Sequence, residues 1–179
     1  VQQFKGTSIH ENGVLDEIEN ALSEYQSISQ SGNSALDVIL TEKKLICNHE
    51  GIHLSSIADG GLLDFMEPTD IASIFGNALD NAIEYERMHV EAEKRSIFLK
   101  VVRKNCFVCI SIENYCTDFP ELFGGFPVTT KQNKELHGYG LKSMEYVVKK
   151  YGGSFRIVPY GNMFAHVVGY DSHGKNGIE

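Results

Sequence analysis

Residues 74–85, with the sequence IFGNALDNAIEY, form the stretch around which the rest of the chain is organised. Ser73, Asn77, Asn81 and Glu84 follow one another at helical spacing, so they share one stripe of a predicted helix. Apolar side chains form a second stripe at spacings of three and four residues, as in an amphipathic helix: Ile71, Ile74, Phe75, Ala78, Ala82 and Ile83.

The two asparagines in this helix call for an explanation. Asn is a poor helix former because its side-chain amide competes for nearby backbone groups. Asn77 and Asn81 lie one turn apart, which indicates a pair of amides lining a nucleotide pocket. An Asn carbonyl oxygen can hold Mg²⁺, and the amide nitrogen can donate to phosphate. The alternative is a polar helix face turned to water.

Three further features fit a nucleotide pocket. Gly138-x-Gly140 precedes a predicted helix, so backbone amides can approach a phosphate where the helix dipole adds positive potential. Lys131 can neutralise phosphate charge, or it is an ordinary surface lysine. Asn114 ends a predicted strand, where its amide can accept from the exocyclic amine of adenine or cap the following turn.

Composition narrows the class of protein. The chain has 179 residues, 42% of them hydrophobic, enough for one core and a small appendage. A formal net charge of −8 without a basic run argues against a nucleic-acid surface. Apolar stretches are too short for a membrane span, and no signal peptide opens the chain, so we expect a cytoplasmic location. Cys106 and Cys109 lie on a predicted strand and are expected to fill the core.

The order of predicted elements alternates helices and strands. Residues 15–28 read as one helix, and Ser34 or Asn33 is expected to cap a second. Their apolar stripes must be covered, either by the following domain or by a second copy of the chain. Thr69 is expected to cap the central helix, which we expect to continue to about Glu93.

Strands are predicted before and after the central helix. They cover residues 52–57, a hairpin over 97–103 and 106–113, and a last hairpin over 154–159 and 163–170. A helix from Leu141 ends at Gly152 and Gly153. The long loop over 117–137 is expected to be a lid and to be the least ordered part without nucleotide.

Taken together, these features resemble the histidine-kinase branch of the GHKL superfamily of ATP-binding domains. Asn77-x-x-x-Asn81 resembles the N box, and Gly138-Tyr139-Gly140-Leu141 resembles the G2 box. Residues 32–43, 77–84 and 129–141 resemble the sensor kinases of peptide-pheromone (Agr-type) systems. The resemblance covers nearly the whole chain and implies the Bergerat fold. This fold is an α/β two-layer sandwich, a mixed sheet covered on one face by helices, with ATP and Mg²⁺ beneath a lid.

The resemblance also implies roles for individual residues. Asn77 would be the magnesium ligand and Asn81 a contact to phosphate and the metal shell, with Lys131 as the third catalytic residue. Gly138, Gly140 and Leu141 would lie against the phosphates. Nucleotide contacts are further implied for Glu84, Tyr85, Asn114, Thr130, Lys131, His137 and Tyr139.

Two departures from the family pattern matter. The usual D-x-G-x-G is replaced by residues 113–117, ENYCT, so Asn114 stands where most histidine kinases have an adenine-binding Asp. Gyrase-like ATPases carry a general-base Glu at the position of Asn77, and an amide there argues for phosphoryl transfer to a side chain and not to water. The altered box leaves open a GHKL-like phosphorelay or scaffold dimer that does not use ATP, and a gyrase-like hydrolase is a third reading.

The resemblance divides the chain into three parts. Residues 1–33 would be the end of the dimerisation hairpin, 34–171 the catalytic domain and 172–179 a tail. The phosphoacceptor histidine is expected upstream of Val1, because His10 lies past the helix that carries it. The expected partners are a second copy, bound through the N-terminal helices, and a response regulator. No nucleic acid is expected, and membrane attachment is expected only through a sensor region farther upstream.

Overall fold

A computed structural model describes residues 30–116, 122–123, 126–127, 139–160 and 163–171. The predicted helix over 15–28 lies outside these residues, as does most of the predicted lid. Four predicted site residues also lie outside them: Thr130, Lys131, His137 and Gly138.

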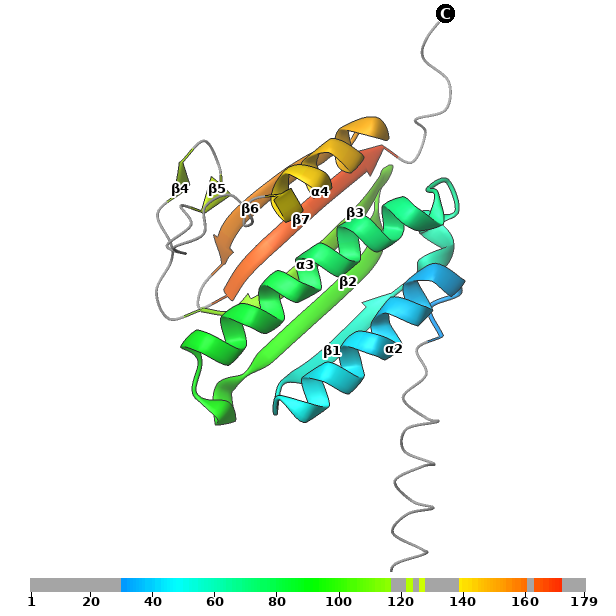
Figure 1. Ribbon diagram of the computed structural model, residues 1–179. Coiled ribbons are helices and arrows are strands. Elements are labelled where there is room, and N and C mark those ends of the chain that lie inside the picture. The colour runs from blue at the N-terminus through cyan, green and yellow to red at the C-terminus, as the bar shows by residue number, and fades with distance from the viewer. Residues whose placement is uncertain (1–29, 117–121, 124–125, 128–138, 161–162, 172–179) are drawn as a thin grey trace, which may run out of the picture.

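A five-stranded mixed sheet forms one layer of the molecule (Figure 1). Its strands are β1 (His53–Ala58), β2 (Ser96–Lys104), β3 (Phe107–Tyr115), β6 (Ser154–Tyr160) and β7 (Met163–Asp171), in the order β1-β2-β3-β7-β6. Only β1 and β2 are parallel, and the other neighbours are antiparallel. The short strands β4 (Leu122–Phe123) and β5 (Phe126–Pro127) pair separately. Both predicted hairpins are therefore present.

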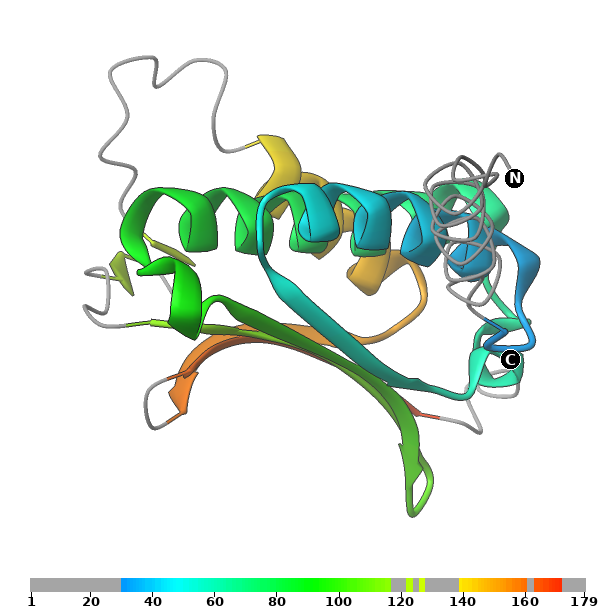
Figure 2. The ribbon, with the colours of Figure 1, turned by 90° about the horizontal axis from the view of Figure 1, so that it is seen from below.

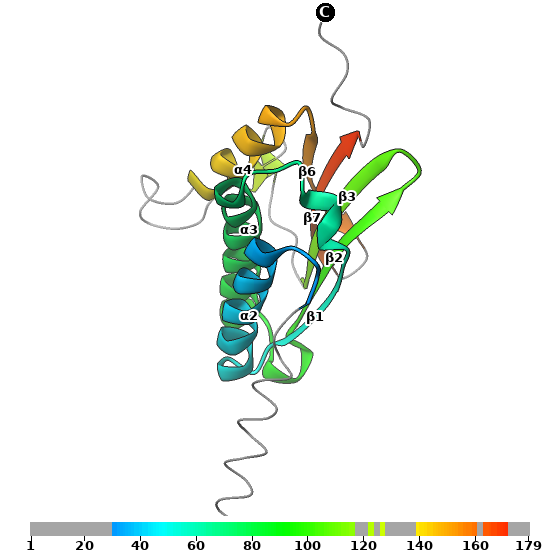
Figure 3. The same cartoon turned by 90° about the vertical axis from the view of Figure 1, so that its right-hand side faces the viewer.

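Three helices form the second layer: α2 (Ser34–His49), α3 (Pro68–His89) and α4 (Tyr139–Lys150). They lie side by side (Figure 1), and the two views along the edge of the sheet show them on the same face of it (Figures 2 and 3). Two 3₁₀ turns, η1 (Gly60–Leu63) and η2 (Ala92–Lys94), flank α3. The predicted two-layer sandwich is confirmed.

The hydrophobic core lies between the layers. Every second residue is buried on β3 and on β2 as far as Val101, because successive side chains of a strand point to opposite faces and only one face meets the helices. The six apolar residues of the central stripe are all buried, as predicted. The largest fully buried side chains are Leu36, Leu40, Leu63, Ile71, Ile74, Phe75, Leu79, Ile97, Leu99, Ile110 and Ile112. Each contributes roughly 1.5–3 kcal/mol through burial.

The ends of the helices test the predicted caps. Asn33 caps α2 as expected, since its Oδ1 accepts from the backbone N–H of Leu36 at 3.2 Å. The prediction for Thr69 is wrong. The preceding Glu67 is the N-cap residue of α3, it makes no side-chain cap bond, and Pro68 opens the helix at a position that needs no N–H donor.

Two more predictions need correction. The central helix ends at His89 and not near Glu93, because Val90 turns extended and buries its side chain. Cys106 and Cys109 are partly exposed and do not fill the core. Cys109 lies on the β3 face that points away from the helices, and Cys106 lies in the preceding turn. Among the described residues, no helix has the length and apolarity that crossing a membrane requires.

Candidate functional site

Helices α3 and α4 run antiparallel, and polar contacts set their register. At one end, Asp70 accepts from Lys150 Nζ at 2.6 Å and from the Tyr151 hydroxyl at 2.7 Å. The hydrogen bond from Lys150 is the main reason that the pKa of Asp70 is lowered. Near the middle, the Ser73 and Ser143 hydroxyls lie 2.8 Å apart. This register brings the first turn of α4 against Asn77.

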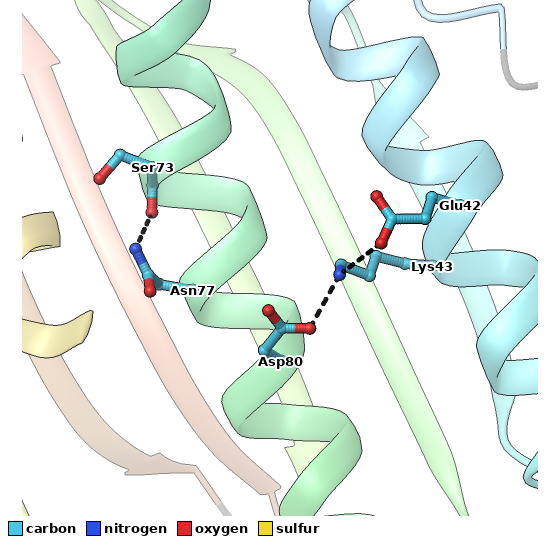
Figure 4. Close-up of polar contacts among 5 residues, drawn as sticks. All are labelled: Glu42, Lys43, Ser73, Asn77 and Asp80. Carbon is cyan, nitrogen blue, oxygen red and sulfur yellow. Dashed lines mark hydrogen bonds and ion pairs between the residues drawn. The ribbon is translucent and has the colours of Figure 1, made fainter. Parts of the chain in front are cut away.

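Asn77 presents its carbonyl oxygen to the start of α4. Its Nδ2 donates to the backbone oxygen of Ser73, one turn earlier on α3, at 2.6 Å (Figure 4). Its Oδ1 faces Gly140, where an added Cβ would lie only 3.0 Å from that oxygen. A glycine at position 140 therefore allows the backbone of α4 to approach the amide closely. The structure thus brings together one residue from each of the two predicted boxes.

The remaining residues of the polar stripe follow Asn77 along α3. Asn81 and Glu84 are half-buried, so the stripe is neither fully solvated nor part of the core. Among the described residues, the Asn81 side chain makes no hydrogen bond. The stripe is therefore partly exposed along α3, the helix that lies between α2 and α4 (Figure 1).

An apolar wall continues from this stripe toward the sheet. Cys116, just after β3, and Ile157 on β6 are buried and pack with Tyr85, Leu141 and Phe155. The Tyr85 hydroxyl lies 3.0 Å from Cys116 Sγ. The wall joins α3, α4, β3 and β6, and it includes two predicted nucleotide contacts, Tyr85 and Leu141. Tyr139, a third, is 69% exposed at the start of α4.

Asn114 lies at the end of β3 and is only 2% exposed. Its Nδ2 donates to the backbone oxygen of Tyr115 at 3.0 Å. Beside it lies Glu86, a fully buried carboxylate in the last turn of α3. Glu86 accepts from the backbone N–H of Tyr115 at 2.5 Å and from that of Ser96 at 3.2 Å.

Burial raises the pKa of Glu86 to about 7, against hydrogen bonds from Ser96, Tyr115 and the Asn114 side chain that lower it. The sequence analysis did not single out Glu86. Its spacing from Leu79, Ala82 and Ile83 places it on the buried stripe of the helix, and an acidic residue at such a position was the available signal.

A second buried charge, Lys43, lies outside the predicted site and joins α2 to α3. Lys43 is 7% exposed, and its Nζ lies 2.9 Å from Asp80 and 3.0 Å from Glu42 (Figure 4). Burial alone lowers the pKa of this ammonium, but the hydrogen bonds to Asp80 and Glu42 outweigh it and the net pKa is raised. The ion pair with Asp80 is therefore a link between α2 and α3.

The oxygen atoms near Asn77 suit a hard cation such as Mg²⁺ that is bound mainly by the phosphates of a nucleotide and only in small part by the protein. No group of three His, Cys, Asp or Glu side chains that could hold a metal occurs among the described residues. Mg²⁺ commonly keeps several waters and binds through one or two protein oxygens plus substrate phosphates. The Oδ1 of Asn77, beside a helix N-terminus that attracts phosphate, fits that mode of binding.

Comparison with known proteins supports the fold. A family model described as the GHKL domain matches residues 66–168, more than half of the chain. The nucleotide-free catalytic domain of histidine kinase ThkA is 18% identical, with a TM-score of 0.57 over 77% of this chain and 90% of that one. A second nucleotide-free form of it is 16% identical, with a TM-score of 0.58 over 77% and 92%.

The Acinetobacter baumannii histidine kinase AdeS is 12% identical, with a TM-score of 0.51 over 95% of this chain and 87% of that one. No curated protein matches the chain. Identities this low show a shared fold, and the family assignment rests on the match over residues 66–168. The chain therefore belongs to the GHKL domain family, with the α/β fold of histidine kinase catalytic domains.

Proposed function

We propose that this chain is the ATP-binding catalytic domain of a sensor histidine kinase of the peptide-pheromone type. It transfers the γ-phosphoryl group of ATP to a histidine upstream of Val1, for relay to a response regulator. The observation that carries the proposal is the approach of Asn77 Oδ1 to Gly140, in the first turn of α4. An oriented amide oxygen and a helix N-terminus meet there, as binding of a metal–phosphate group requires.

The protein groups at this site position the phosphates and the metal ion and provide positive electrostatic potential at the start of α4. The N-terminus of α4 attracts the phosphates, and Asn77 is held with its oxygen outward because its nitrogen is bonded to Ser73. Mg²⁺, when bound, neutralises charge that develops on the transferred group. Asn81, one turn farther along α3 and half-buried, would donate to phosphate oxygens. Lys131 and Gly138 belong to the proposal through the family resemblance.

The absence of a general base at position 77 favours transfer to an imidazole. An amide cannot take a proton from water, so Asn77 cannot serve as the base of a hydrolase. A histidine acceptor is itself a nucleophile and needs mainly to be positioned in line. The proposal includes a homodimer formed through the N-terminal helices and a cytoplasmic location for this domain.

Calorimetric titration with ADP and Mg²⁺ tests the binding step. We expect a saturable heat, and weaker binding when EDTA removes the metal. A thermal shift measured with the same ligands provides a second readout. Absence of both signals at millimolar nucleotide would contradict the proposal and favour the scaffold dimer.

Labelling with γ-³²P ATP tests the transfer step. We expect residues 1–179 to bind ATP without becoming labelled, and a longer chain that begins upstream of Val1 to acquire acid-labile, base-stable phosphate. Such a label on residues 1–179 would place the acceptor within them, and His10 would be the first residue to replace. Steady phosphate release would instead indicate a hydrolase.

A further inference from the structure

Glu86 is a buried titratable group that the proposed phosphate chemistry does not use. It connects three elements, because its carboxylate lies at the end of α3 and accepts from Ser96 at the start of β2 and Tyr115 at the end of β3. The Asn114 side chain provides a third hydrogen bond to it. A buried charge with this many donors is organised to remain an acceptor.

The partners of Asn114 determine how its amide is turned. An ionised carboxylate and a backbone carbonyl only accept hydrogen bonds, so both Glu86 and the Tyr115 oxygen require the Nδ2 side of the amide. The two hydrogens of Nδ2 are thereby used within the protein. The Oδ1 of this 2%-exposed side chain accepts no hydrogen bond among the described residues.

Glu86 is ionised, and therefore only accepts hydrogen bonds, above its pKa of about 7. Arg95 favours its ionised form, and the guanidinium itself donates to the backbone oxygens of Glu50, Arg87 and Val90. Cys47 faces it from α2, and burial followed by the charge of Glu86 raises the pKa of that thiol to about 11, so it stays neutral. Arg87 and His89, on the same helix as Glu86, are exposed.

We propose that Glu86 is a positioning residue that turns the Asn114 amide so that Oδ1, and not Nδ2, faces the bound base. The site then selects purines with an amino group at position 6 over those with a 6-oxo group. This inference rests on the proposed nucleotide binding, and it adds a determinant of base specificity that does not itself contact the base.

The same contacts explain an amide at position 114. A carboxylate there would face the Glu86 carboxylate and the Tyr115 carbonyl oxygen, which places acceptors against acceptors in a buried setting. Asn114 with Glu86 offers the base one acceptor, as an aspartate would. The asparagine at position 114 and the buried Glu86 therefore depend on each other.

The test compares binding of Mg²⁺-ADP and Mg²⁺-IDP, which differ at position 6 of the base. Wild type should bind ADP about 10–100-fold more tightly than IDP. The 6-amino group of ADP donates a buried hydrogen bond to Asn114 Oδ1, whereas the 6-oxo group of IDP places a second acceptor against that oxygen. In Glu86→Gln the carboxylate that only accepts is replaced by an amide that can also donate, and only the Tyr115 oxygen still requires the Nδ2 side of Asn114, so the amide is held less firmly and turns more readily to donate to a 6-oxo group. We expect the ADP-to-IDP affinity ratio to fall by about 10-fold. Glu93→Gln, the same substitution at an exposed glutamate, should leave the ratio unchanged.

The possible results separate the two proposals. If wild type binds neither nucleotide, the proposed function fails. If wild type binds both equally, or if Glu86→Gln weakens both by the same factor, nucleotide binding stands and the positioning role of Glu86 is overturned. A loss of stability in the variant lowers the apparent affinities for ADP and IDP by the same factor, so it cancels in the ADP-to-IDP affinity ratio.

Two measurements need no variant that disturbs the core. In nucleotide-free wild type, the Asn114 side-chain NH₂ resonances should shift together with the titration of Glu86 near pH 7. The ADP-to-IDP ratio of wild type should decrease from pH 8 to pH 6, because a protonated Glu86 loses an acceptor; phosphate titration affects both ligands alike and cancels. Side-chain resonances and a ratio that are constant across this range would overturn the inference.

Discussion

Asn77 and Asn114 are two amides whose orientations are fixed by different means. The nitrogen of Asn77 donates to Ser73 on the same helix, four residues earlier, so the orientation is a local property of α3. The nitrogen of Asn114 is directed by its neighbour Tyr115 and by Glu86, whose helix joins β3 only in the folded protein. The first amide is set by helix geometry, whereas the second depends on packing between a helix and two strands.

Asn77→Asp should show the largest effect. The carboxylate loses the donor to Ser73 and places a negative charge where phosphate is expected, so we expect affinity for Mg²⁺-ADP to fall by about 100-fold or more. Stability should change by less than about 1 kcal/mol, because the residue is half-buried at the edge of the core. Calorimetric titration and urea denaturation measure the two quantities.

Asn48→Asp is the matched control, because this exposed asparagine lies at the end of α2, away from the site. Its nucleotide affinity should equal that of wild type. Unchanged affinity in Asn77→Asp would show that the orientation of the Asn77 amide within α3 does not matter for nucleotide binding.

The pH dependence of the free energy of unfolding tests whether Glu86 is buried beside Asn114 between the helix and the two strands. The folded protein gives up the Glu86 proton near pH 7, whereas the unfolded chain gives up the same proton near its ordinary pKa of 4.5. Raising the pH across this window therefore favours the unfolded state. The contribution of this group is fully present below pH 4.5 and is lost as the pH rises through 7.

Urea denaturation from pH 5 to pH 8 should show a loss of roughly 2 kcal/mol in wild type relative to Glu86→Gln, which cannot titrate. Parallel stability curves for the two proteins would show that Glu86 is not buried in the way described. The prediction for stability is opposite in sign to that for base selectivity, which increases with pH.

Gly140→Ala should have a smaller effect, confined to Asn77. Its Cβ would lie 3.0 Å from Asn77 Oδ1, so the amide must shift by a few tenths of an ångström. We expect affinity for Mg²⁺-ADP to fall by about 10-fold, as measured by titration. The ADP-to-IDP ratio should not change, because Asn114 is not touched.

Gly76→Ala is the matched control, since a Cβ there meets no atom within 4 Å. It should leave affinity unchanged and stabilise α3 by about 0.5–1 kcal/mol. Equal affinities for Gly140→Ala and Gly76→Ala would argue against a close approach of α4 to the bound phosphates.

Tyr151→Phe should have the smallest effect on the site. The Tyr151 hydroxyl donates to Asp70 and accepts from the backbone N–H of Glu67, which joins the end of α4 to the start of α3. Its loss should cost about 1 kcal/mol of unfolding free energy and change nucleotide affinity less than about twofold. A large loss of affinity would show that the helix register, and not the individual amides, controls binding.

Much of the fold could be predicted from periodicity. The central stripe, the hairpin over residues 97–103 and 106–113 and the Asn33 cap all follow from short-range rules, and all three are present; the hairpin turn lies at Asn105 and Cys106, because Lys104 still pairs with Phe107. Two of the errors concern positions where tertiary burial competes with local preference. Val90 leaves the helix to bury its side chain, and Cys109 falls on the open face of a strand whose other face is covered.

The sequence by itself determined the polar stripe with Asn77 and Asn81, because helical spacing alone aligns these side chains. It also determined that a glycine would stand before or within the first turn of a later helix. Only the tertiary structure decided that Gly140 lies against Asn77, and that Glu86 lies beside Asn114. The physical reason is that hydrogen-bond partners from separate elements, and the burial that shifts a pKa, exist only once helix and sheet have packed together.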